Sequence, residues 1–475
     1  MKAFKNIFFA LLGGFLFLSL PAAAQNKTDY QKLNRDLDIL QEALYTTHPG
    51  VFEYISKDSL DRLFSELHFQ SPEGANKLEL ERRVRIILSR LGCIHTSLTG
   101  EPALEPPKAR LPFQLHAEGN DIYILKDLSD SLSGLAGGRI LAINGHPAHT
   151  IINAMLPYHA SDGYNQSFQY KLANAGSRFS FFYAYYFDTD SLKTYLIETP
   201  AGDTLRLRRS QNKKTPAPTA KKAKSEKSPY GKHISLNLYE DEHFAVMEIR
   251  SFHGSVAGNK KHYRQIIELL NQHQIPNLVI DLRGNLGGDA SAANALISHF
   301  LSQPHTIDRE RKKSKMLKKS TLMTRGLYGV EYLFKIMFHK AVKTDSSKIF
   351  YKQIEPNSKV RYHGKVFILT DGFTASAASL VASVLQQKAH ASVIGEESGG
   401  GAEAFNAFFR PVMKLPYSHI KIHVPLYRIH LHLKEDKGHG VIPDFSIHYT
   451  LQELQNGRDP EMEKVREMIR NEARR

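Results

Sequence analysis

The sequence predicts a mixed protein with an α/β core, a helical N-terminal region and a β-rich middle region. Two short apolar runs, Val366–Leu369 and Asn277–Ile280, are each followed by a turn and then by apolar residues at helical spacing. Residues 28–100 repeat apolar side chains with a helical period, whereas residues 108–209 contain short alternating runs. Short buried strands that alternate with helices are typical of an α/β sheet. We therefore place the core at residues 234–468.

The first 25 residues have the pattern of a secretory signal peptide. Lys2 and Lys5 precede the apolar run Ile7–Leu20, and small residues follow it up to Ala24. This pattern predicts export with cleavage near Ala24, and an uncleaved membrane anchor is the alternative. Cys93 is the only cysteine, so no disulfide can form within the chain. Export without disulfides favours the bacterial periplasm or cell envelope.

Ser376 lies where the predicted strand Val366–Leu369 gives way to a helical pattern at Ala375–Gln387. A hydroxyl held at such a turn is well placed to act as a nucleophile, since free amides at a helix N-terminus can bind a developing oxyanion. The alternative is that Thr374 and Ser376 only cap the helix. The turn alone leaves these two interpretations open.

A second turn follows the other predicted strand, in the segment IDLRGNLGG at residues 280–288. Glycines at Gly284, Gly287 and Gly288 allow backbone amides to approach a ligand closely. The alternative is an ordinary strand-to-helix turn of an α/β sheet.

The two turns together resemble those of the serine endopeptidase family of the C-terminal processing (tail-specific) peptidases. That family includes the tricorn core and the repeats of the interphotoreceptor retinoid-binding protein. Its Asp-Leu-Arg-x-Asn-x-Gly-Gly segment stands at residues 281–288, and its Ser-Ala-Ser turn stands at Thr374–Ser376. The match continues at Val393–Glu396 and Gly440–Asp444, and more weakly over residues 28–468. The resemblance implies a ClpP/crotonase-like peptidase core with a helical domain and a PDZ-like domain before it.

The resemblance also implies an active site. Ser376 matches the nucleophile, and His95, in the segment LGCIHTSL, matches the histidine of the tricorn-like branch. The amide of Ala377, with that of Gly287 or Gly288, would form the oxyanion hole. Such a site needs no cofactor and no metal.

Two positions depart from the pattern of the family. The processing branch carries a lysine 25 residues after the serine, and this chain has Gly401 there. The tricorn-like branch carries a glutamate three residues before Gly440, and this chain has Lys437. The chain is thus closer to the tricorn-like branch, and Glu435 or Asp436 is the candidate for orienting His95.

Other segments carry weaker signals. Residues 137–145 resemble the turn and strand of a PDZ domain, with an ordinary hairpin as the alternative. Residues 210–233 are predicted to be a basic flexible linker. A second basic insertion at about residues 306–347 is interpreted as a flap beside the active site or, equally, as a solvated excursion. His430 and His432 lie on one strand face, but without a third ligand they predict no metal site.

The formal net charge of +15 is concentrated in the linker and the insertion. No zinc-finger or nucleic-acid-binding motif accompanies this charge, so no nucleic-acid partner is predicted. Weak contact with an anionic envelope surface is a minor alternative. The leading hypothesis is an exported serine peptidase that acts on peptides or unfolded proteins. The alternative is a non-catalytic relative that binds a peptide or an apolar ligand in the same cleft.

Overall fold

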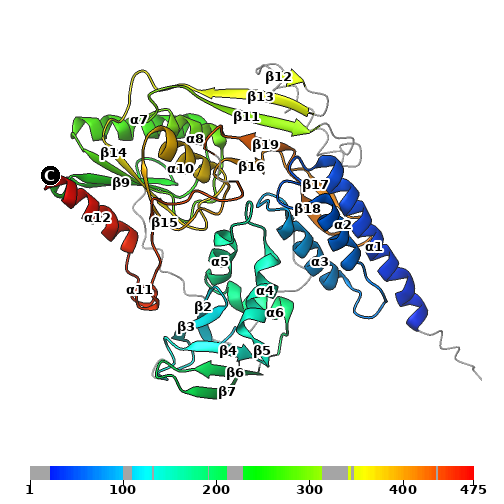
Figure 1. Cartoon of the computed structure of the whole chain (residues 1–475). Coiled ribbons are helices and arrows are strands. Elements are labelled where there is room, and N and C mark those ends of the chain that lie inside the picture. The colour runs from blue at the N-terminus through cyan, green and yellow to red at the C-terminus, as the bar shows by residue number, and fades with distance from the viewer. Residues whose placement is uncertain are drawn as a thin grey trace, which may run out of the picture.

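The computed structural model describes residues 22–99, 110–130, 133–190, 192–210, 228–312, 341–343, 347–434 and 437–474. Figure 1 shows the α/β core, the N-terminal helices and the β-rich middle region in separate parts of the view, with the loops of the middle region reaching towards the core. The predicted linker, apart from its two ends, and residues 313–340 of the basic insertion lie outside the described residues. None of the helices in the described part is long and apolar enough to cross a membrane.

The core is built on a six-stranded sheet. Its strand order is β20 (Phe445–Ser446), β15 (Ser392–Gly395), β14 (Lys365–Thr370), β10 (Asn277–Asp281), β9 (Phe244–Ile249) and β8 (Ile234–Tyr239). All neighbours are parallel except β8, which pairs antiparallel with β9 through a connection that contains the short helix η2 (Glu240–Glu242). The central strands are apolar on both faces because helices cover both faces. The two strands that the apolar runs predict, β14 and β10, are adjacent in register.

Helices pack on both faces of this sheet. The helices α7 (Val256–Gln272), α8 (Ala290–Ile297) and α10 (Ala377–Lys388) share the largest apolar cluster with one face. On the other face, Val465 and Ile469 of α12 (Pro460–Ala473) pack against β10 and β14. The short helix α11 (Leu451–Asn456) precedes α12. The strand-to-helix order brings the N-termini of α8 and α10 to the same edge of the sheet.

A second, antiparallel sheet covers one side of the core. Its order is β12 (Ala341–Lys343), β13 (Ser347–Ile354), β11 (His305–Lys312), β19 (Tyr427–His430) and β16 (Ala404–Ala407). The ends of the predicted insertion are therefore paired strands, since β11 pairs with β13 over eight residues.

The N-terminal helices do not have a closed core of their own. The helices α1 (Ala22–Thr47), α2 (Lys57–Glu66) and α3 (Lys77–Arg90) pack against apolar residues between 415 and 424. A small sheet of β1 (Ser97–Thr99), β18 (Lys421–His423) and β17 (Val412–Lys414) joins the two segments. The predicted domain boundary near residue 100 thus stays a prediction.

The middle region has more helix than the sequence analysis anticipated. Its sheet contains β2 (Phe113–Glu118), β3 (Asp121–Asp127), β4 (Arg139–Ile143), β6 (Leu192–Glu198) and β7 (Thr204–Ser210), and β5 (His146–Pro147) pairs with β4. Between β5 and β6 lie α4 (Ala148–Met155), η1 (Leu156–Tyr158), α5 (Ser167–Asn174) and α6 (Arg178–Tyr186). The aromatic side chains of α6 resemble a strand in composition, but most of them are buried on all sides. The PDZ-like character of this region remains a prediction.

Candidate active site

The strand-to-helix turn before α10 holds Ser376 in a strained conformation. Ser376 has φ 57° and ψ −119° and precedes the first residue of α10, yet its side chain makes no capping hydrogen bond. A non-glycine residue in this region is rare and is most often found at functional sites. Thr374 differs, because its hydroxyl donates to the carbonyl of Leu282 (3.0 Å) and accepts from the amide of Asp371 (3.0 Å). Thr374 is thus structural, and Ser376 has no capping role.

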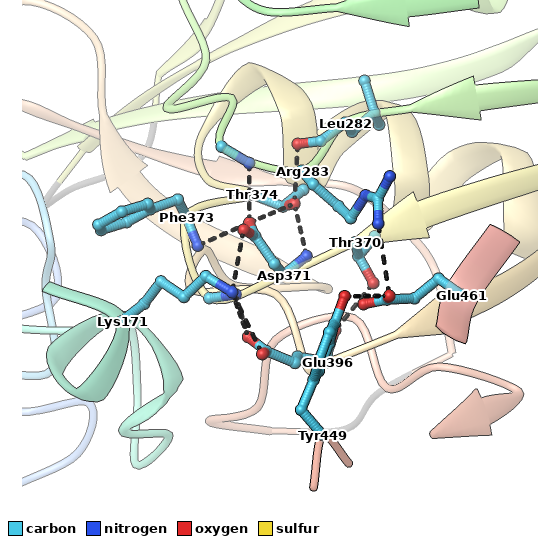
Figure 2. Close-up of polar contacts among 12 residues, drawn as sticks. Lys171, Leu282, Arg283, Thr370, Asp371, Phe373, Thr374, Glu396, Tyr449 and Glu461 are labelled. Atoms are coloured by element: carbon cyan, nitrogen blue, oxygen red, sulfur yellow. Dashed lines mark hydrogen bonds and ion pairs between the residues drawn. The ribbon is translucent and has the colours of Figure 1, made fainter. Parts of the chain in front are cut away.

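The two predicted turns are tied together by backbone amides, as Figure 2 shows in part. The Asp371 carboxylate accepts from the amides of Gly284 (2.9 Å) and Phe373 (3.0 Å). The amide of Ala375 donates to the carbonyl of Asn285 (3.0 Å). The Ser376 turn is therefore fixed on the glycine-rich turn of the neighbouring strand.

Two charged networks anchor these turns to the rest of the molecule (Figure 2). Lys171 of α5 lies 3.3 Å from Asp371 and 3.2 Å from Glu396, which connects the middle region to the core. These carboxylates raise the pKa of Lys171 against the opposing effect of its burial. On the other side, Arg283 pairs with the residues Asp281 (2.7 Å), Asp459 (2.8 Å) and Glu461 (3.4 Å).

Two free amides lie beside Ser376, one in the glycine-rich turn and one at the start of α10. Gly287 itself donates its amide to Asn285 Oδ1 (2.8 Å), so this amide is already occupied. A Cβ at Gly287 would lie 2.8 Å from Ser376 Cβ and 2.9 Å from the Ala377 nitrogen. Within the described part of the chain, the amides of Gly288 and Ala377 make no hydrogen bond, and both residues line the cavity at Ser376. Of the two glycines predicted for the oxyanion hole, Gly288 is the one with an available donor.

Ser376 and His95 line the same cavity although they are far apart in sequence. The cavity has a volume of about 600 Å³ and lies between α8, α10, the second sheet and the loop that carries His95. No hydrogen bond joins the two side chains among the described contacts. Catalytic contacts are often loose before substrate binds.

The imidazole of His95 is held in its neutral form. Burial, with the positive charge of Arg410 and the nearby His159, lowers the pKa of His95 to about 3. Its ring stacks on Phe405, with centroids 6.2 Å apart, and its Nδ1 is buried without a hydrogen-bond partner among the described residues. A neutral imidazole can accept a proton, and the described groups that act on it are Arg410, His159 and the backbone of Asn406, with no carboxylate among them.

The backbone beside His95 is held by a residue that the sequence analysis missed. Asp162, which is buried, accepts from the amide of Ile94 (2.9 Å) and from the amide of Gly401 (3.1 Å). Burial raises the pKa of the Asp162 carboxyl to about 7, against the lowering effect of these two amides. An Asp-Gly pair is common in ordinary turns, so the sequence contained no signal for this role.

The position that holds a lysine in the processing branch has no room for one. A Cβ at Gly401 would lie 2.5 Å from the carbonyl oxygen of Ala404. The adjacent Gly400 lies against the nucleophile turn, since a Cβ there would lie 2.7 Å from the Ser376 nitrogen. The loop at Gly400 and Gly401 packs against the backbone of Ser376 and of Ala404. This packing leaves no room for a lysine side chain at Gly401.

The acid predicted to orient His95 cannot be placed. Glu435 and Asp436 lie outside the described residues, and the next residue, Lys437, pairs with Glu53 (3.0 Å). The candidate acids thus stay predictions.

A second histidine, which the sequence analysis also missed, lines the cavity. His159 contacts the Ala160 carbonyl through Nδ1 (2.9 Å), so Nδ1 carries the proton and Nε2 is left as an acceptor. Burial lowers the pKa of His159. His159 is thus a competing candidate for a base. No group of three metal-binding side chains is present in the described part of the chain.

Comparisons with known proteins agree with this architecture. The profile of peptidase family S41 matches residues 243–447. The solved structure of mature CPAF complexed with lactacystin is 14% identical, covers 94% of this chain and 100% of its own, and superposes with a TM-score of 0.62. The photosystem II D1 C-terminal processing protease is 13% identical, with 88% and 93% coverage and a TM-score of 0.39. The tricorn protease is 12% identical, with 94% and 37% coverage and a TM-score of 0.38.

A search of the curated proteins finds no match. The likeness to CPAF shows a shared fold across nearly the whole length of both chains. The matched residues contain both turns of the site, the Ile-Gly-Glu strand and the Gly-Val-Ile-Pro-Asp segment. Residues 243–447 therefore carry a domain of peptidase family S41.

Proposed function

We propose that the protein is an exported serine-type peptidase that cleaves peptide bonds through Ser376, with His95 as the general base. The observation that carries this proposal is the free hydroxyl of Ser376 at a strained turn, in one cavity with His95 and two unoccupied amides. Strain of this kind persists only where the surrounding structure maintains it, and it clusters at active sites.

The proposed reaction follows the acyl-enzyme route. The Ser376 hydroxyl attacks the scissile carbonyl carbon while His95 takes its proton. The amides of Gly288 and Ala377 donate hydrogen bonds to the oxyanion of the tetrahedral intermediate. His95 then returns the proton to the leaving amine, and water hydrolyses the ester by the same steps. Glu435 or Asp436 would orient the imidazole.

A non-catalytic binding protein is the second candidate. It is favoured by one observation, that His95 Nδ1 has no hydrogen-bond partner in the described part of the chain. Without an orienting acid, a Ser-His pair loses much of its rate. In that case the cavity would bind a peptide without cleaving it.

A fluorophosphonate probe and a disordered peptide substrate separate these candidates. Wild-type protein freed of its signal peptide should be labelled and should cleave the peptide, and Ser376→Ala should lose both activities. Ser383→Ala is the matched control, because Ser383 is buried on the same helix but does not line the cavity. His95→Ala should lower turnover by at least about 10³-fold.

Three further results would change the proposal. If His159→Ala abolishes turnover while His95→Ala does not, the base is His159. If folded wild-type protein is neither labelled nor active on any disordered peptide, the binding protein is the correct interpretation. A double Glu435→Ala and Asp436→Ala variant with full activity would remove both acids from the mechanism.

A further inference from the structure

The second sheet contributes an arginine to the wall of the cavity. Arg309 of β11 pairs with Ile429 of β19, and Ile429 pairs with Phe405 of β16 (Figure 1). Residues that pair across an antiparallel sheet point to the same face, and all three of these residues line the cavity. Phe405 stacks on the ring of His95. Arg309 therefore lies two strands away from the aromatic ring beside the proposed base, which is about 10 Å at the usual strand spacing.

A second arginine lines the cavity from the loop that follows β16. The guanidinium of Arg309 lies over the ring of Phe408, 4.4 Å from its centroid, and Arg410 follows Phe408 by two positions in the chain. Burial is the main cause of the lowered pKa of His95 and of His159, and the positive charge of Arg410 adds to it in both cases. The charge of Arg410 thus reaches the part of the cavity that holds the proposed base.

The lining of the cavity has little negative charge to balance these two arginines. Among the described residues, Asp289 is the one acidic side chain that lines the cavity. Its Oδ1 accepts from the amide of Ser291 (2.6 Å) at the N-terminus of α8. Two arginines and one aspartate leave one positive charge in excess. Charges of one sign that line a cavity attract a ligand of the opposite sign, because the protein walls focus their field.

We propose that the cavity selects substrates with an acidic side chain, glutamate or aspartate, within two residues of the cleaved bond, and that Arg309 and Arg410 bind its carboxylate. This inference rests on the proposed function, because it assigns the substrate class of the same site. The cavity of about 600 Å³ is in the size range that encloses a drug-sized ligand, so it can hold the attacked carbonyl group together with a neighbouring side chain. The two arginines would determine specificity, whereas Ser376 and His95 would perform the reaction.

Other classes of side chain fit this lining less well. A lysine or arginine side chain would add a third cation beside Arg309 and Arg410. A neutral side chain would not offset the excess positive charge of the lining. A carboxylate can accept two parallel hydrogen bonds from one guanidinium, and such charge-assisted bonds are about twice as strong as those between neutral groups. Glutamine has nearly the shape of glutamate without its charge, so it provides the matched comparison.

The test uses peptides that are blocked at both ends and differ at one position at a time, from two residues before the cleaved bond to two residues after it. Each position carries glutamate, glutamine or lysine. At one or more of these positions, the wild-type kcat/KM should be at least about tenfold higher for the glutamate peptide than for the glutamine peptide. Arg309→Gln and Arg410→Gln should each lower this ratio, and the double variant should abolish it. Arg410→Glu should reverse it in favour of the lysine peptide.

Arg470→Glu is the matched control for the change of charge. Arg470 is an exposed arginine of α12 that does not line the cavity, so the ratio should keep its wild-type value. Each variant is judged by the ratio of two peptides, so any effect of Arg410 on the rate through His95 cancels. Cleavage of the glutamine peptide shows that each variant is folded. Added salt should lower the kcat/KM for the glutamate peptide more than that for the glutamine peptide, because it screens the charges.

Three results would overturn the inference. The first is a ratio of glutamate to glutamine near one at every position in the wild type. The second is a preference for glutamate that persists in the double variant or is lost equally in Arg470→Glu. The third concerns a peptide without acidic side chains and with a free C-terminus. If this peptide is cleaved faster than its blocked form while glutamate gives no advantage, the arginines bind the carboxylate of the chain terminus instead.

The failure of the inference and of the proposed function can be told apart by binding. In Ser376→Ala protein, calorimetry should give at least about tenfold tighter binding of the blocked glutamate peptide than of the glutamine peptide. If the wild type cleaves no peptide but Ser376→Ala binds with this preference, the peptidase proposal fails and the inference about the two arginines stands. If cleavage occurs without any preference for glutamate, the peptidase proposal stands and the inference fails.

Discussion

The turn that carries Ser376 and the loop that carries His95 are held in place in different ways. The Ser376 turn is fixed mainly within the core, by hydrogen bonds with the adjacent glycine-rich turn and by close packing at Gly287, where an added Cβ would meet Ser376, and Lys171 of the middle region adds a salt bridge to Asp371. The His95 loop precedes the core in sequence. Asp162, from the middle region, joins its backbone to the loop at Gly401.

This difference separates what is encoded locally from what depends on assembly. The nucleophile depends mainly on two neighbouring strands and the turns that follow them, with one salt bridge from Lys171 of the middle region. The base needs the N-terminal segment, the middle region and the core to dock together. A substitution that disturbs the Ser376 turn should damage the core itself. A substitution that disturbs the His95 loop should leave the core folded but His95 out of position.

The largest effect is expected at Gly287. Gly287→Ala would place a Cβ against Ser376 and Ala377 in a backbone with φ +96°. Strain and overlap together should lower the free energy of unfolding by about 3 kcal/mol or more. Peptide cleavage should fall below detection. Chemical denaturation and the peptide assay measure the two effects.

Gly284→Ala is the matched control for Gly287→Ala. Gly284 also has a positive φ, +74°, but a Cβ there meets nothing within 4 Å. Only backbone strain of about 1–2 kcal/mol is expected, with activity retained. Equal losses of activity in the two variants would show that the close approach of Gly287 to Ser376 is not what the site requires.

An intermediate effect is expected at Asp162. Asp162→Ala leaves the buried amide of Ile94 and that of Gly401 without an acceptor, which should cost about 1–3 kcal/mol for each. Because His95 then loses its fixed position, kcat should fall by about 10–100-fold with little change in KM. Thermal unfolding and steady-state kinetics measure these quantities.

Asp127→Ala distinguishes positioning from general destabilisation. Asp127 is equally buried and also accepts from two backbone amides, but these belong to Ser129 and Asp130 and not to the loop that carries His95. The Asp127→Ala variant should be less stable than the wild type and should keep the wild-type kcat. If Asp127→Ala lowers kcat as much as Asp162→Ala does, Asp162 has no special role in placing His95.

The same comparison explains how much the sequence could predict. The strands β10 and β14 and the helix α10 follow from apolar runs and helical spacing, so the fold of the core and the place of Ser376 were within reach of pattern reasoning. The strained φ of Ser376 could not be predicted in this way, because it depends on how the turn packs against Gly287 and Gly400. A family motif marked these positions without giving their geometry.

The base was harder to predict, because its surroundings are contributed by distant segments. The resemblance indicated His95, but nothing in the local sequence indicates that Asp162 holds its loop or that His159 shares its cavity. The helices α4 to α6, which carry or flank these residues, were missed for a related reason. In α6 most of the surface is buried, which hides the one-sided apolar pattern of a surface helix, whereas α4 and α5 bury one face but are only eight residues long.

The smallest effect concerns the pH dependence of cleavage. A solvated histidine base would give a rate that rises through about pH 6.5. Burial, Arg410 and His159 lower the pKa of His95 to about 3, so the imidazole is already neutral throughout the range in which the folded protein can be assayed. The kcat/KM should therefore show no His95 titration between pH 5 and pH 8. Arg410→Gln should raise the pKa of His95 and move the acidic limb to higher pH.

Asp162 provides a control for that profile, because its pKa of about 7 lies inside the same range. The carboxyl is neutral below this pKa and ionised above it, and only the ionised form accepts fully from both amides. A modest rise in rate near pH 7 that disappears in Asp162→Asn would belong to the positioning of the loop. A rise near pH 6.5 that persists in Asp162→Asn and disappears in His95→Ala would contradict the buried, neutral state of His95. The base would then be exposed to solvent in the working enzyme, and the loop would be less firmly held than the turn at Ser376.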